Sequence, residues 1–182
     1  MGKKFLRLVI VLLVSMLTCY AASNLEAAQS DSLSVKVTVT PALSVNITET
    51  ALALGSVATG SITASTSAVT VTNDGSGVNE TYSLSLTNPL GWTASQTAAG
   101  VETYVLNALF DADGTGISWS ETNHALSTTP VACSTTKFAG DQTGISVLYN
   151  AVRKLWFQFK APTATNVNTE QSISVTITAQ VG

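Results

Sequence analysis

The sequence has few charged residues and a single histidine, and these shortages weigh against several classes of function. Only 10% of its 182 residues are Asp, Glu, Lys or Arg, against about a quarter in ordinary globular domains. A serine triad would have to use His124 as its base, and its polar surroundings predict a solvated side chain. No Gly-x-Ser-x-Gly elbow, His-Glu-x-x-His motif or glycine-rich phosphate loop occurs. We therefore expect a protein that is not an enzyme and that needs no cofactor.

Long apolar runs are also missing. The run Leu8–Leu17 follows three cations and has about half the length of a membrane-spanning helix. Small residues around Ala27 and Ala28 come after it. A positive start, a short apolar run and a small-residue exit predict a secretory signal peptide over residues 1–28. We expect no permanent membrane span and a secreted or cell-surface location.

Cysteine is scarce too, with only Cys19 and Cys133 in the chain. Lipidation of Cys19 is disfavoured, because Thr18 stands where lipoprotein signals carry Gly, Ala or Ser. Once the leader is removed, Cys133 has no intrachain partner. It is then either a buried, small apolar side chain, which we favour, or a bridge between two subunits.

The charge that remains is acidic. Residues 29–182 carry five cationic and ten anionic side chains, a net charge of −5. An acidic surface repels phosphate backbones, so we expect no nucleic-acid partner. A pair of carboxylates for glycoside hydrolysis would form only in three dimensions, but most of the acids stand beside turn residues, where we expect them to be solvated.

What the sequence does contain is alternation of apolar and polar residues with period two. This pattern predicts strands with one buried face, separated by Gly, Asn or Pro, and no window shows sustained helical periodicity. The segment Leu155–Phe159 is the most apolar and predicts a central strand, whereas residues 114–144 predict long loops with one or two short elements. The fold class is therefore all-β, a single antiparallel β-sandwich of Ig-like or jelly-roll type over residues 29–182. The predicted strands centre on residues 33–39, 43–47, 69–71, 82–86, 105–110, 145–147, 155–159 and 173–177.

The first of these strands stands at a free chain end once the leader is removed. Leu33, Val35, Val37 and Val39 alternate with polar residues, and Pro41 follows. Pro interrupts a ladder of backbone hydrogen bonds, so the preceding strand can move independently. Residues 29–40 are therefore a possible exchangeable strand, which completes either its own sheet or that of a neighbour.

One loop has the composition of a metal site. Asp111-Ala112-Asp113-Gly114-Thr115-Gly116 places two carboxylates on a turn, and calcium prefers several oxygen ligands. Because only two carboxylates are close, we favour a hairpin turn in which Gly114 has a positive φ angle. Calcium binding by Asp111 and Asp113 remains the alternative.

Aromatic residues suggest a second function. Six Trp and Tyr side chains could stack on sugar rings: Trp92, Trp119, Trp156, Tyr82, Tyr104 and Tyr149. We expect Trp92 and Trp156 to lie in the core instead. Trp119, in a polar stretch, is the best candidate for an exposed platform.

Two stretches resemble the opening of bacterial Ig-like surface domains. There, a G-x-V-x-x-G strand precedes a V-T-V-T-N-x-G strand and turn, as in Leu54–Gly60 and Val69–Gly75. Gly91–Ala94 and Leu155–Phe157 are similar to the paired tryptophan motifs of WxL-type cell-wall-binding domains, but neither Trp has Leu two places on. The resemblance implies a surface-associated β domain and assigns no binding residue.

These patterns together predict a secreted structural protein. We expect a self-assembling subunit of an extracellular fibre, sheath or layer. Donor-strand exchange by residues 29–40 is one route to such an assembly, and the alternative is that these residues form an ordinary first strand of their own domain. The alternative is a carbohydrate- or cell-wall-binding module that contacts a polysaccharide through exposed aromatic residues.

Overall fold

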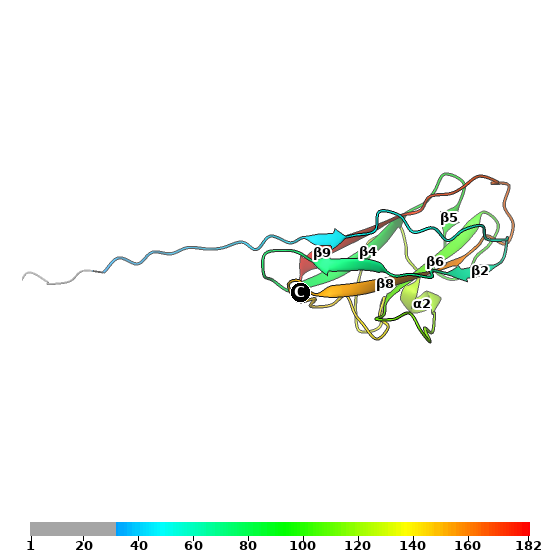
Figure 1. Cartoon of the computed structure of the whole chain (residues 1–182). Coiled ribbons are helices and arrows are strands. Elements are labelled where there is room, and N and C mark those ends of the chain that lie inside the picture. Colours follow the sequence, from blue (N-terminus) through cyan, green and yellow to red (C-terminus); the bar gives the residue numbers. More distant parts are fainter. Residues whose placement is uncertain (1–31) are drawn as a thin grey trace, which may run out of the picture. The chain divides into compact units, whose positions relative to one another are not determined.

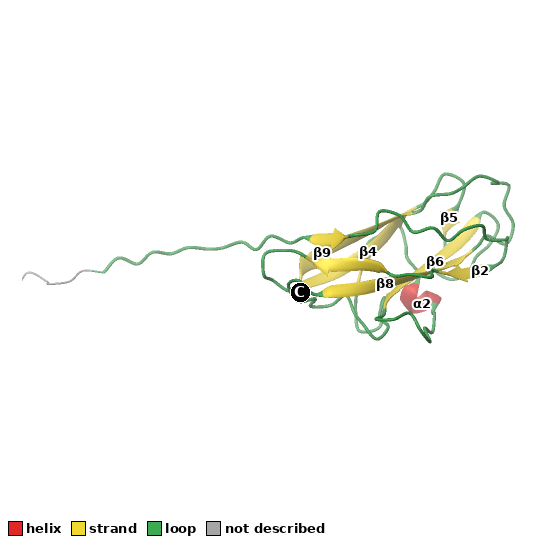
Figure 2. Ribbon diagram, in the orientation of Figure 1, coloured by secondary structure: helices red, strands yellow, loops and turns green. Residues whose placement is uncertain are grey.

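The computed structural model describes residues 32–182, so the predicted signal peptide at 1–28 lies outside the described residues. Thr40–Gly182 form one compact unit, and the residues up to Val39 belong to a second. The compact unit is mostly β: strands make up 36% of the structure, with one very short helix. Figures 1 and 2 show the strands arranged in two sheets. This confirms a β-rich, two-sheet fold.

The larger sheet is organised around β8. Its strands are β1 (Val45–Ile47), β2 (Ile62–Ala64), β3 (Val69–Asn73), β5 (Thr93–Ala94), β6 (Thr103–Phe110) and β8 (Val152–Lys160). The order is β1-β3-β8-β6-β5, and β2 also pairs with β8. The predicted central strand is thus confirmed, because β8 pairs with β2, β3 and β6.

This sheet is mixed and not wholly antiparallel. β5 pairs with β6 in parallel, through Thr93 opposite Thr103 and Ala94 opposite Tyr104. The antiparallel prediction is wrong for this pair. A two-residue strand carries no alternation that a sequence pattern could detect.

The smaller sheet has the order β7-β4-β9, formed by β7 (Val131–Ala132), β4 (Glu80–Thr87) and β9 (Ser174–Val181). β4 and β9 are antiparallel over their full lengths, with Glu80 opposite Val181 and Thr87 opposite Ser174. The alternation of apolar and polar residues in both strands turns one face of this sheet toward the core. β9 therefore ends the sheet as a long edge strand.

The core contains the apolar faces of both sheets. Tyr82, Leu84 and Leu86 enter it from β4, and Leu155, Phe157 and Phe159 from β8. The two-residue spacing within each group is the periodicity of the sequence, expressed as burial. Tyr82 packs against Phe110 with ring centroids 6.1 Å apart.

The predicted turn at Asn73-Asp74-Gly75 joins β3 of the larger sheet to β4 of the smaller sheet. These two strands do not pair, so the turn connects the two sheets and does not close a hairpin. Gly75 is required there for space. A Cβ atom on Gly75 would lie 2.6 Å from Glu80 Oε1 and 2.8 Å from the carbonyl oxygen of Ala42. The turn is therefore packed against the chain that leads into β1.

The region from 114 to 144 contains the four-residue helix α2 (Glu121–His124) and the short strand β7. Long loops with one or two short elements were the prediction, and it is confirmed. Within residues 32–182, no helix has the length and apolar character that crossing a membrane requires.

Candidate functional site

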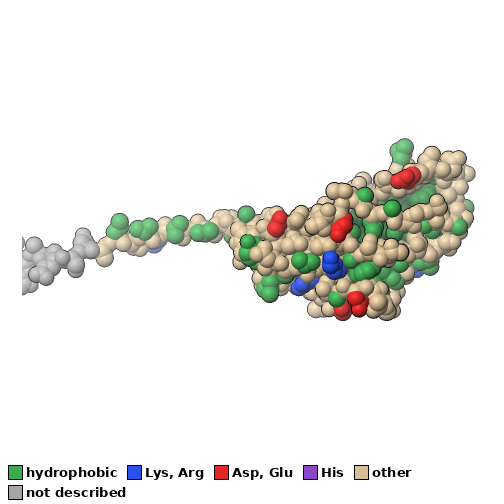
Figure 3. Space-filling view, viewed as in Figure 1, with side chains coloured by type: hydrophobic (Ala, Val, Ile, Leu, Met, Phe, Trp, Pro, Cys, Tyr) green, Lys and Arg blue, Asp and Glu red, His purple; other side chains and the backbone are tan. Residues whose placement is uncertain are grey.

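Residues 33–39 are not part of any strand, although the sequence predicts one there. The exposed fractions of Leu33, Val35, Val37 and Val39 are 88%, 81%, 82% and 82%. This segment is the blue stretch of Figure 1, and Figure 3 shows apolar side chains along it in green. Isolated strands have no partner for their backbone groups and are not stable in water. Residues 33–39 therefore have the apolar–polar alternation of a strand but do not pair with a neighbouring strand.

The chain becomes fixed just after Pro41. Ala42 exchanges backbone and side-chain hydrogen bonds with Ser76: its carbonyl accepts the Ser76 N–H at 2.8 Å, and its own N–H donates to Ser76 Oγ at 2.7 Å. The Ser44 carbonyl accepts the N–H of Asp74 at 3.1 Å. These bonds hold residues 42–44 against the turn between β3 and β4. Pro41, the predicted interruption, stands where this anchoring starts.

Glu80 reinforces the anchor from inside the protein. Its side chain is fully buried, and Oε1 accepts the Ser44 N–H at 2.8 Å. Oε2 has no hydrogen-bond partner among the residues that the structure describes. No local sequence pattern indicates this contact, because Glu80 stands before the alternating residues 82–86 like an ordinary polar residue at the start of a strand.

Glu49 ties the other end of β1 to β3. Oε2 accepts hydrogen bonds from Thr48 Oγ1 at 2.7 Å and from the Thr70 N–H at 2.6 Å. The hydrogen bond from the Thr48 hydroxyl is the largest cause that lowers the pKa of Glu49, to about 2. The short strand β1 is therefore held at both ends by carboxylates.

The two aspartates of the predicted turn use their oxygens within the loop. Asp111 Oδ1 accepts the Gly114 N–H at 2.9 Å, and Asp113 Oδ1 accepts both the N–H and the hydroxyl of Thr115 at 2.8 Å. The hydrogen bond from the Thr115 N–H is the main cause that lowers the pKa of Asp113. Gly114 has φ 76°, as the turn prediction requires, but the turn leads to α2 and is not a hairpin. Within residues 32–182, no three His, Cys, Asp or Glu side chains cluster closely enough to hold a metal ion.

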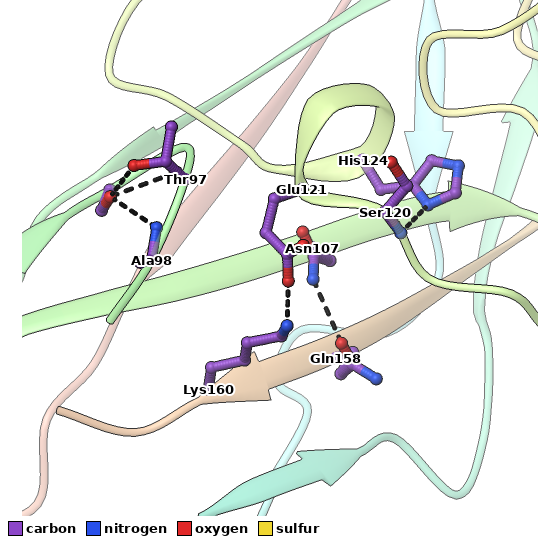
Figure 4. Close-up of polar contacts among 9 residues, drawn as sticks. Thr97, Ala98, Asn107, Ser120, Glu121, His124, Gln158 and Lys160 are labelled. Atoms are coloured by element: carbon purple, nitrogen blue, oxygen red, sulfur yellow. Dashed lines mark hydrogen bonds and ion pairs between the residues drawn. The ribbon is translucent and has the colours of Figure 1, made fainter. Parts of the chain in front are cut away.

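His124 is buried, so the prediction of a solvated side chain is wrong. It closes α2, and its Nδ1 accepts the N–H of Ser120 at 3.1 Å (Figure 4). Burial is the main cause that lowers its pKa. His124 thus accepts a structural hydrogen bond within α2. The sequence pattern did not predict this role.

The face of the larger sheet beneath α2 carries a small polar cluster. Glu121 of α2 forms an ion pair with Lys160 of β8. Beside it, Asn107 Nδ2 of β6 donates to Gln158 Oε1 at 3.1 Å, and Figure 4 shows the two pairs next to each other. Both charged side chains remain about a quarter exposed, and their ion pair joins α2 to the sheet.

The aromatic residues do not form one platform. Tyr82 and Tyr104 are fully buried, and Trp92 stacks on Phe159 with ring centroids 6.0 Å apart. Trp156 lies outside the core, on the opposite face of β8, where its Nε1 donates to the carbonyl of Asp111 at 2.9 Å. Core packing is thus confirmed for Trp92 and wrong for Trp156.

The two remaining aromatic side chains are those of Tyr149 and Trp119. Tyr149 is half exposed. Trp119 is partly exposed and contacts the ring of His124 edge-on, with centroids 6.0 Å apart. The predicted platform residue is therefore supported by the buried His124.

Cys133 is buried in the core. Burial raises the pKa of its thiol to about 12. This agrees with the favoured interpretation of a small apolar side chain. A thiol in this position cannot reach a second subunit without opening the fold.

The chain matches no protein-family model, no curated protein and no solved structure. The resemblance to Ig-like and WxL-type surface domains therefore stays a prediction.

Proposed function

We propose that the mature chain is a secreted structural subunit that assembles into an extracellular fibre, sheath or layer by donor-strand exchange. Residues 29–40 of one copy supply a strand to the next copy. The two-sheet fold is then a β-sandwich of Ig-like or jelly-roll type that receives the strand. The predicted leader supports the extracellular location.

A single observation carries the proposal. The four apolar side chains of residues 33–39 are more than four-fifths exposed, in a segment that has no ladder partner. Contiguous exposed apolar surface of this kind marks an interaction site in soluble proteins. Period-two alternation is what a strand needs when one face meets a core and the other meets water. Both features make sense if the segment becomes a strand in another copy.

The surface of the compact unit is compatible with close packing of copies. The face drawn in Figure 3 shows scattered charged groups among mostly uncharged side chains and backbone. Few charges on neighbouring copies would have to be brought together or desolvated. The side chains singled out for chemistry are engaged in structural hydrogen bonds or buried, which supports a non-enzymatic role.

The test is truncation of the exchanged strand. The chain starting at residue 29 should form large species in size-exclusion chromatography, whereas the chain starting at Pro41 should elute as a monomer with an intact β spectrum. The segment is exposed in the single chain, so its loss should not unfold the domain. A mature chain that stays monomeric at high concentration would argue against this function.

A polysaccharide-binding module is the second candidate, favoured by the partial exposure of Trp119. Its supported position on His124 gives it a fixed orientation, as sugar stacking requires. A pull-down on cell-wall polysaccharide that is lost with Trp119→Ala and kept after removal of residues 29–40 would support this candidate over assembly.

A further inference from the structure

β9 is the longest strand with an unpaired edge in residues 32–182. β4 covers one side of β9 over its full length, and no strand pairs with the other side. The other strands that pair on one side only, namely β1, β2, β5 and β7, have two or three residues each. A donor of seven residues, 33–39, finds a matching length only on β9.

The hydrogen bonds of β4 show which backbone groups of β9 face outward. The N–H of Tyr82 donates to Gly144, and its carbonyl accepts from Cys133, so both groups point away from β9. Opposite residues of an antiparallel pair either exchange both bonds or both turn away. Ala179 lies opposite Tyr82, and its N–H and C=O therefore point out of the sheet.

Backbone groups also point outward near both ends of β9. The N–H groups of Glu80 and Leu86 also bond away from β9, and they lie opposite Val181 and Val175. The outward backbone groups of β9 make no hydrogen bond with another residue in the described part of the chain. β1 comes near β9 from the larger sheet without a hydrogen bond between them.

This edge also lacks the usual protection. Soluble proteins guard long edge strands with charged residues, Pro or bulges. β9 reads S-V-T-I-T-A-Q-V and contains no charged residue and no Pro, and its pairing with β4 runs without a bulge. An unguarded edge of this length is a template for a further strand.

The side chains of β9 decide which register a donor can take. Ile177 is buried, and Val175 and Ala179 pack against the core, whereas the even-numbered residues of β9 are exposed. Opposite residues in a ladder place their side chains on the same face. An apolar donor residue must therefore lie opposite an odd-numbered residue of β9, because a shift by one would reverse every side chain.

We propose that residues 33–39 of a second copy of this chain pair with the outer edge of β9, with their apolar residues opposite the odd-numbered residues of β9. Leu33, Val35, Val37 and Val39 then extend the apolar face of the smaller sheet. The alternate residues, Lys36 among them, remain in water. This inference rests on the proposed function, because it names the surface that accepts the exchanged strand.

Disulfide trapping between differently tagged variants, each with one introduced cysteine besides the buried Cys133, tests the site. One full mature chain carries Thr38→Cys, and its partner carries Thr176→Cys, Thr178→Cys or Gln180→Cys. Paired strands bring such residues within disulfide range, on the solvent face and away from buried Cys133. The matched control is Ala64→Cys on β2, an exposed residue on a different edge.

We expect a mixed disulfide with at least one β9 variant, at least tenfold more abundant than with the Ala64→Cys control. Assembled material that cross-links to Ala64→Cys and to no β9 variant would overturn the acceptor site and leave the proposed function standing. Absence of any assembly would reject the proposed function itself. A chain carrying both Thr38→Cys and Thr178→Cys that closes an intrachain disulfide as a monomer would overturn both.

A proline at the acceptor edge provides a second readout. Ala179→Pro removes an N–H that is not bonded within the chain, and Pro is tolerated at such edge positions. We expect a melting temperature close to that of the native chain and at least a tenfold loss of assembled protein. Undiminished assembly by the folded variant would overturn the assignment of β9, and a variant that fails to fold leaves the decision to the cross-linking result.

Discussion

The apolar face of residues 33–39 should set the strength of assembly. Val35 and Val37 are exposed to 81% and 82% in the single chain, so nearly all of their surface is available for burial. Full burial of a Val side chain is worth about 1.5 kcal/mol or slightly more. Val175, on the β9 edge that would accept the donor strand, is only partly buried. If Val35 and Val37 become buried to a similar extent in the assembled strand, each contributes about 1 kcal/mol to association.

The double variant Val35→Ser/Val37→Ser should therefore weaken strand exchange by about 2 kcal/mol, which is a factor of about 30 in the association constant. Its melting temperature as a monomer should stay unchanged, because neither side chain is buried there. The measurement is the assembled fraction in sedimentation over a series of protein concentrations. The concentration for half assembly should rise about 30-fold.

The matched control exchanges two residues on the opposite face, Ser34→Thr/Thr38→Ser, and keeps the composition. It should assemble like the native chain, because both positions face water in the proposed strand. Equal assembly by the valine variant and the native chain would show that burial of these valines does not drive strand exchange, and so would equal weakening by both double variants.

Other predictions concern the compact unit and its chemistry. Gly75→Ala should destabilise the domain by about 1–3 kcal/mol in urea unfolding, because the new Cβ would meet the side chain of Glu80 and the backbone of Ala42. Gly77→Ala should lower the free energy of unfolding by only about 1 kcal/mol, because Gly77 has φ +75° but open space around it. A larger loss of stability in Gly77→Ala than in Gly75→Ala would show that the turn is not tightly packed at Gly75. The pKa of Glu49 is lowered to about 2, so its stabilising contribution is complete above pH 4.5 and is lost as pH falls through about 2. Thermal melts of Glu49→Gln should therefore fall less steeply over this range than those of the native chain, and parallel curves would exclude a role for this carboxylate. With its pKa raised to about 12, the Cys133 thiol should react with a disulfide reagent at pH 8 only after unfolding; rapid reaction of the native protein would show that the site opens.

The parts of the fold that the sequence predicted are those in which one local pattern decides the structure. β8 follows from the dense apolar residues at 155–159, and β9 follows from the alternation at 173–177, because burial on one face of a sheet requires period two. Gly114 was predicted in a turn because a positive φ angle favours Gly. Each of these signals lies within a few adjacent residues.

The parts that were missed depend on residues far apart in the chain. Glu80 is buried because the turn at Gly75 and the anchored residue Ser44 pack over it, and no local pattern records such a contact. His124 is buried, and Lys137 and Ala139, which lie after β7 in the chain, are close to it. The strand prediction for residues 33–39 identified a pattern that has no ladder partner among residues 32–182, and this mismatch leads to the proposed exchange.

The most direct test of strand exchange is negative-stain electron microscopy of the purified mature protein, residues 29–182, at high concentration. Strand exchange should produce extended polymers whose subunits are linked head to tail, because each copy gives one strand and offers one free β9 edge. Uniform single particles under the same conditions would contradict it.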